Sequence, residues 1–109
     1  MIKKIIIGNK EYTMKASAYT QFAYRDLTGR SLLKDLQNFQ GINTDEVNTI
    51  DILSETLLDI AFVLANEGNP TEVSNKIDFI KGIDNLFDNP KWIEEVVTLA
   101  ASPLYTGKN

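Results

Sequence analysis

Residues 3–16 read Lys3-Lys4-Ile5-Ile6-Ile7-Gly8-Asn9-Lys10-Glu11-Tyr12-Thr13-Met14-Lys15-Ala16, and this stretch decides the fold. Gly8-Asn9 separates two apolar runs, and both residue types adopt the positive φ values of a two-residue hairpin turn at low cost. The turn pairs Ile7 with Lys10, so alternation predicts a hairpin with one apolar side, formed by Ile5, Ile7, Tyr12 and Met14. A lone hairpin is marginal in water, so we expect this side to dock on helices.

The rest of the chain has helical periodicity. Its 109 residues, 43% of them hydrophobic, suffice for one compact core. We predict an α+β fold that is mainly α: one domain, residues 1–109, with a hairpin at 1–16, a bundle of about five helices at 17–103 and a mobile tail at 104–109. The apolar runs are too short to cross a bilayer or to form a signal peptide, so we expect no membrane partner and no export.

Charge is distributed unevenly along the chain. Residues 1–41 carry a net charge of +4 and residues 42–109 carry −8. No basic residue occurs between Lys34 and Lys76, so the middle of the chain should project a negative field. This field repels a phosphate backbone, and we expect no nucleic-acid partner. The simpler interpretation of the acidic residues is a solvated face that keeps a small protein soluble.

The residue types that most enzymes use are missing. The chain has no cysteine and no histidine, which removes disulfides, thiolate sites and the usual ligand or base of zinc and acid–base chemistry. Glu94 and Glu95 are adjacent on a predicted helix, about 100° apart, so they cannot converge on one bond as acid and base. We therefore predict a binding protein that is not an enzyme and has no cofactor and no metal.

Two short helices are predicted after the hairpin. Ser17 is the expected N-cap of the first, and Gly29 ends it in the left-handed conformation. Tyr24 falls opposite its core stripe, either at the rim or in a contact surface, and the stripe consists of Tyr19, Phe22, Ala23 and Leu27. The second helix runs from Ser31 to a stop at Gly41 and carries Leu32, Leu33, Leu36 and Phe39.

The longest helix is predicted from Thr49 to Asn66, with its main stripe at Ile50, Leu53, Leu57, Ile60, Ala61 and Leu64. Another side carries acids at four-residue spacing: Asp51, Glu55 and Asp59. Without histidine or matching ligands from a second helix, these acids indicate a solvated face and not a metal site. Ile52 and Val63 also project away from the main stripe, so this helix is either central in the bundle or leaves one side for a partner.

Two further segments are helical in pattern. Thr71 is the expected cap of a helix carrying Val73, Ile77 and Ile80, and Gly82 either weakens this helix or divides residues 71–87 into two. The last helix has Asn89 as its expected N-cap, Pro90 at its first position and an end at Ser102-Pro103. We expect Trp92 in the core with its N–H at the surface.

This order of motifs resembles that of the tail assembly chaperones of long-tailed, siphovirus-type bacteriophages. The resemblance is carried by Ile5 to Met14, Tyr19 to Asp26 and Thr28 to Leu33, and it extends more loosely through the acidic helix to residues 90–101. The family often has Asn-Gly at the hairpin turn where this chain has Gly8-Asn9. This departure changes the turn type and not the hairpin.

The resemblance implies a protein that binds the long, mostly helical tape measure protein, keeps it soluble and helps bring tail tube subunits to it. It implies a location in the cytoplasm of the infected bacterial host and absence from the mature virion; self-association is left open. Modest apolar contacts with charge complementarity can cover the apolar stripes of such a client. The candidate contact residues, whose predicted angles leave them off the main stripes, are Tyr24, Ile52, Phe62 and Val63.

The resemblance also implies ribosomal frameshifting, because the family often makes a longer form by a −1 slip near the end of the short reading frame. The sequence at 106–109 is compatible with slip-prone codons. The rival interpretation is an acidic nucleic-acid mimic or antitoxin-like inhibitor, in which Asp51, Glu55 and Asp59 imitate phosphates. The basic N-terminal third dilutes such a field, so we favour the chaperone.

Overall fold

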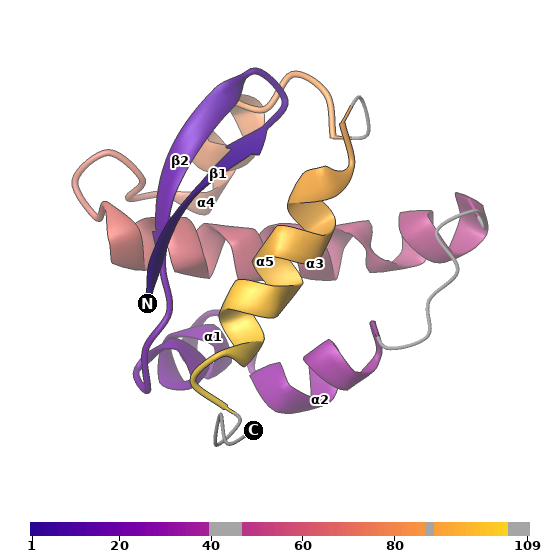
Figure 1. Cartoon of the computed structure of the whole chain (residues 1–109). Coiled ribbons are helices and arrows are strands. Elements are labelled where there is room, and N and C mark those ends of the chain that lie inside the picture. Colours follow the sequence, from indigo (N-terminus) through magenta and orange to yellow (C-terminus); the bar gives the residue numbers. More distant parts are fainter. Residues whose placement is uncertain (40–46, 87–88, 105–109) are drawn as a thin grey trace.

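The computed structural model describes residues 1–39, 47–86 and 89–104, and for residues 47–53 it describes the backbone alone. Within these ranges the elements are β1 (Ile2–Ile7), β2 (Lys10–Lys15), α1 (Thr20–Thr28), α2 (Leu32–Gln37), α3 (Val47–Gly68), α4 (Lys76–Lys81) and α5 (Lys91–Ala101). The two strands form one antiparallel hairpin (Figure 1). The predicted α+β fold, mainly helical with a small N-terminal hairpin, is confirmed.

The hairpin has the predicted register, with Ile7 opposite Lys10 and Ile5 opposite Tyr12. In the turn only Gly8 has a positive φ, at 65°, and Asn9 does not share it. This is the pattern of a type II′ turn, in which glycine occupies the first central position. The predicted apolar side is buried and packs on α3 and α5, which supply the cover that a lone hairpin lacks.

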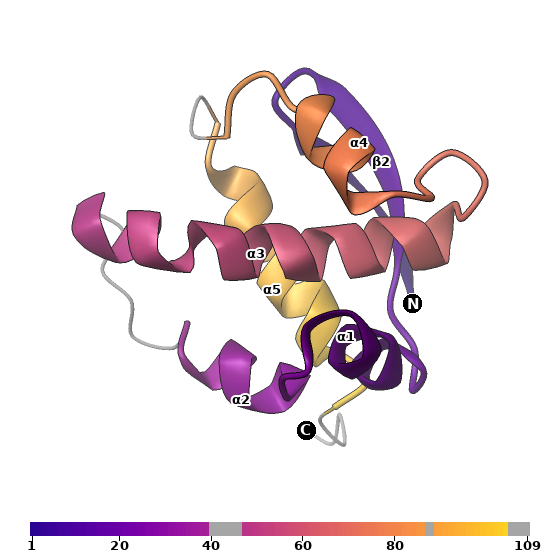
Figure 2. The same cartoon turned by 180° about the vertical axis from the view of Figure 1, so that it is seen from behind.

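Helix α3 runs through the middle of the molecule, and the other elements lie around it (Figures 1 and 2). It contacts β2, α1, α4 and α5, and every residue from Leu57 to Ala65 is buried. The part of the predicted stripe that the structure describes, from Leu57 to Leu64, is confirmed, whereas the Ile50 and Leu53 side chains lie outside the description. Over residues 57–65 the helix is therefore central, and this stretch leaves no side for a partner.

The last turn of α3 passes very close to β2. A β-carbon added to Gly68 would lie 2.2 Å from the carbonyl oxygen of Thr13, far inside van der Waals contact. Only glycine fits at this crossing without moving the backbone.

The start and rotation of α1 differ from the prediction. The helix begins at Thr20 with Tyr19 at its cap position, and Ser17 lies one turn earlier. Thr20 and Tyr24 are buried, whereas the predicted core residues Tyr19, Phe22 and Leu27 are exposed. Gly29 ends the helix with a φ of 75°, and its N–H donates to the carbonyl oxygen of Arg25, as the sequence predicts. Ser31 caps α2, which buries Leu32 and Leu36 and ends at Gln37, and the predicted stop at Gly41 lies outside the described residues.

The helix predicted from Thr71 is shorter and rotated. Its cap is Asn75, it ends at Lys81, and Phe79 is buried while Ile77 is exposed. The Phe79 ring packs against Tyr12 with ring centroids 5.1 Å apart, and this contact turns the Phe79 side of α4 toward the core. One helix therefore stands in the described part of residues 71–87.

Helix α5 follows the prediction within one residue. Pro90 is the cap residue, and the Asn89 side chain accepts the N–H of Lys91 at 3.4 Å. Trp92 is buried as predicted, and its indole N–H donates to the carbonyl oxygen of Leu86 at 2.7 Å and is not at the surface. Leu104 packs against the core, so the predicted mobile tail does not begin there, and residues 105–109 lie outside the description.

Candidate functional site

Three of the four residues predicted for partner contact are not surface residues. Tyr24, Phe62 and Val63 are buried, so the prediction that they lie off the core is wrong, and the Ile52 side chain lies outside the described part of the chain. Phe62 and Val63 are buried because α3 is covered on several sides. Tyr24 can be buried because its hydroxyl group has a hydrogen-bond partner, the Asp35 carboxylate.

Tyr24 belongs to a polar cluster that closes the corner between α1 and α2. Its hydroxyl donates to the Asp35 carboxylate at 2.5 Å and accepts from the Arg30 guanidinium at 3.1 Å. Burial, with the hydrogen bond to Asp35, raises the pKa of the Tyr24 phenol above its ordinary value. The hydrogen bonds from Arg30 to Asp35 and Tyr24 raise the pKa of the guanidinium, which therefore stays charged.

The same cluster extends to α3 and α4 through a buried acid. The Asp59 carboxylate accepts from Arg30 at 3.1 Å and from Lys76 at 2.8 Å. The sequence predicts Asp59 on a solvated face with Asp51 and Glu55. This prediction is wrong for Asp59, which is buried, and the hydrogen bonds from two cations offset the free-energy cost of burying its charge. Glu55 is exposed, and the Asp51 side chain lies outside the description. Asp59 therefore cannot present its charge to a partner as a phosphate mimic does.

A second polar cluster fixes the start of α1. Glu67, near the end of α3, accepts hydrogen bonds from the hydroxyl groups of Ser17 at 2.5 Å and Thr20 at 2.7 Å. Thr20 and Tyr24 lie four residues apart, on one side of the helix, and both hydroxyl groups bond to acids. These hydroxyl groups turn one side of α1 inward and leave its aromatic side outward.

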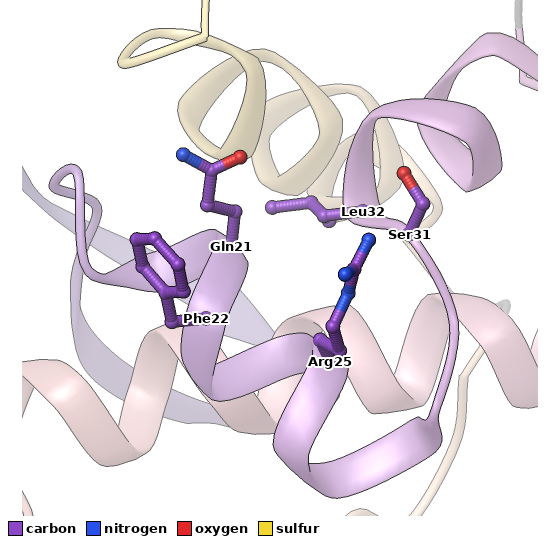
Figure 3. A pocket seen from close by; sticks show the side chains of 5 residues that line it. All are labelled: Gln21, Phe22, Arg25, Ser31 and Leu32. Carbon is purple, nitrogen blue, oxygen red and sulfur yellow. The ribbon is translucent and has the colours of Figure 1, made fainter.

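The outward side carries two aromatic rings. Tyr19 and Phe22 are each 64% exposed and are three residues apart at the first turn of α1, so they lie on the same side. Phe22 also borders a hollow of about 220 Å³ between α1 and α2, which is lined by Gln21, Phe22, Arg25, Ser31 and Leu32. In Figure 3 the Leu32 side chain lies between Gln21 and Arg25, and Phe22 stands at the edge. We call Tyr19, Phe22 and this hollow the α1 surface.

The α1 surface is suited to protein contact. Its hollow is smaller than the roughly 300–1,000 Å³ of small-molecule sites, and it is closer in size to an amino-acid side chain. Exposed aromatic rings beside an arginine are the residue types enriched in binding hot spots. An amphipathic helix can place an apolar side chain against Phe22 and an acid near Arg25. The sequence carries one signal for this surface, the pair of hydroxyl residues Thr20 and Tyr24 that marks the inward side.

Comparisons with known proteins identify no relative of this chain. No protein-family model matches the chain, and no curated protein or solved structure matches it. Among the described residues, no cluster of three or more acids could hold a metal ion. In that same part of the chain, no helix combines the length and the apolar character needed to cross a lipid bilayer.

Proposed function

We propose that this protein is a tail assembly chaperone of a long-tailed bacteriophage. It binds the tape measure protein in the cytoplasm of the infected host, keeps it soluble, helps recruit tail tube subunits and is absent from the finished virion. It acts by non-covalent contact and performs no chemistry. The proposal replaces the contact residues Tyr24, Phe62 and Val63 with the α1 surface.

The observation that carries the proposal is the exposure of Tyr19 and Phe22 on one side of the first turn of α1. Burying two large aromatic rings in the core lowers the free energy of a monomer, so leaving both in water is costly. A helical client with an apolar stripe recovers that free energy by covering them. Arg25 adds a charge that selects clients with an acid beside the stripe.

The proposal is tested by co-expression with the tape measure protein of the same genome, which is recognised as a very long helical reading frame beside the gene. We expect the tape measure protein to remain in the supernatant after centrifugation and to co-purify with the chaperone. Expression with an unrelated acidic protein of similar size is the control. Equal precipitation of the tape measure protein in both cases, without co-purification, would contradict the proposal.

A further inference from the structure

The outer edge of strand β1 presents unpaired backbone groups. Met1 and Ala16 exchange two hydrogen bonds, of 2.9 Å and 2.8 Å, so this pair is a hydrogen-bonded one. Such pairs alternate along an antiparallel ladder, which directs the N–H and C=O groups of Ile2, Lys4 and Ile6 away from β2. Within the described chain, no backbone hydrogen bond to another element engages these outward groups. The edge is therefore able to pair with a further strand.

The side chains along this edge define what pairs with it. Ile2 and Ile6 are 65% and 53% exposed and flank Lys4 on the side of the hairpin away from the core. Lys3, on the core side, has its own partner, since its ammonium group lies 3.4 Å from the Glu95 carboxylate. Lys4 has no ion-pair partner among the residues described. The edge thus carries two exposed apolar side chains, Ile2 and Ile6, with the unpaired positive charge of Lys4 between them.

We propose that the β1 edge binds an extended acidic segment of another protein by strand addition. An Asp or Glu of that segment lies opposite Lys4, and apolar residues two positions before and after it pack on Ile2 and Ile6. A second copy of the chain is a poor occupant, because antiparallel pairing of the outward residues of two β1 strands sets Ile2 against Ile6 and puts the two Lys4 side chains opposite each other. This surface is separate from the α1 surface, and the proposal does not rest on the proposed function.

The probe is a short peptide with the required pattern, acetyl-Thr-Val-Thr-Glu-Thr-Val-Thr-amide, titrated into isotope-labelled protein and followed by amide NMR. The expected result is saturable shifts centred on the amides of Ile2, Lys4 and Ile6. Hydrogen exchange at these three amides should be slower with the peptide than in the free protein, and exchange at Lys3 and Ile5, whose N–H groups already face β2, should change little. The same peptide with Lys in place of Glu should bind about fivefold more weakly or not at all. Equal binding of both peptides, or no shift at β1, would overturn the proposal.

Two variants test the edge: Lys4→Pro removes both the outward N–H and the charge, whereas Lys4→Glu keeps the N–H and reverses the charge. Lys4→Pro removes an outward N–H without touching the ladder to β2, so binding of the Glu peptide should be lost while the hairpin stays folded. Lys4→Glu should reverse the preference and favour the Lys peptide. If Lys4→Pro does not fold, the reversal by Lys4→Glu still decides the outcome. Glu-peptide binding that is unchanged in Lys4→Glu would contradict the proposed pairing of an acid with Lys4 at this edge.

Discussion

Arg30 donates hydrogen bonds to side chains from three helices: Tyr24 of α1, Asp35 of α2 and Asp59 of α3. Lys76, at the start of α4, binds the second oxygen of Asp59. Among the described residues, no buried side-chain nitrogen or oxygen lacks a hydrogen-bond partner. The cluster therefore fixes how α1, α2 and α4 sit against α3, and its loss should reduce stability even though few apolar atoms are involved.

Asp59→Asn should lower the free energy of unfolding by about 1–3 kcal/mol, because the amide retains the shape of the carboxylate but no longer compensates two cations. Arg30 and Lys76 are partly exposed, which keeps the loss below that of a fully buried pair. Urea unfolding measures the change. Glu55→Gln, an exposed acid on the same helix, is the matched control and should stay within about 0.5 kcal/mol. Equal losses in the two variants would contradict a structural role for Asp59.

Tyr24→Phe should alter how stability depends on alkaline pH. The pKa of Tyr24 is raised in the folded protein above the unfolded value of about 10. Above about pH 10 the unfolded chain then binds fewer protons than the folded one, so stability is fully present below that pH and falls as the pH rises toward the folded pKa. Removing the phenol should make this fall shallower.

The measurement is the urea midpoint of the wild-type protein and of Tyr24→Phe at several values from about pH 8 to about pH 11. A residual slope is expected from Tyr12, whose pKa burial also raises. At about pH 8 the variant should be less stable by about 1 kcal/mol, since the hydrogen bond to Asp35 is lost. Identical alkaline slopes for the two proteins would show that Tyr24 does not carry the effect.

At the scale of elements, the predictable parts are those whose determinants lie close together in the chain. The β1–β2 hairpin follows from the Gly8-Asn9 turn and local alternation, and the α5 boundaries follow from Pro90 and Ser102, so both were predictable. The rotation of α1 depends on Glu67, 47 residues away from Thr20, and that of α4 depends on the Tyr12 ring. Hydrophobic periodicity within a helix carries no information about these distant partners, so it predicts the wrong inward side for both helices.

Gly68→Ala tests the close crossing of α3 and β2. The added methyl group meets the Thr13 backbone carbonyl, which cannot rotate away as a side chain can, so the free energy of unfolding should fall by about 1–3 kcal/mol. Gly82→Ala is the matched control, since its nearest neighbours are 3.5 Å from the added carbon and its φ of −79° suits alanine. Thermal unfolding compares the two variants. A Gly68→Ala protein as stable as Gly82→Ala would mean that the strand does not cross there.

For the whole molecule, the proposed contact surface follows from which apolar residues remain exposed after the core is filled. Helix α3 takes the central place and uses most of its apolar residues, including Phe62 and Val63, in the core. Tyr19 and Phe22 are left in water for the opposite reason, because hydroxyl groups occupy the inward side of α1. Composition and periodicity do not predict which apolar residues stay exposed, because exposure depends on contacts between distant segments.

The most direct test of the proposed α1 surface compares two exposed apolar residues for binding to the tape measure protein, the client that we propose. Phe22→Asp should weaken binding about tenfold or more, since it puts a charge at the centre of the contact, and should leave the unfolding midpoint nearly unchanged. Ile77→Asp, on α4 and 61% exposed in the free protein, is the matched control and should bind like the wild type. Biolayer interferometry measures the binding of both purified variants, and urea unfolding measures their midpoints. Wild-type affinity in Phe22→Asp, or an equal loss in Ile77→Asp, would contradict the account.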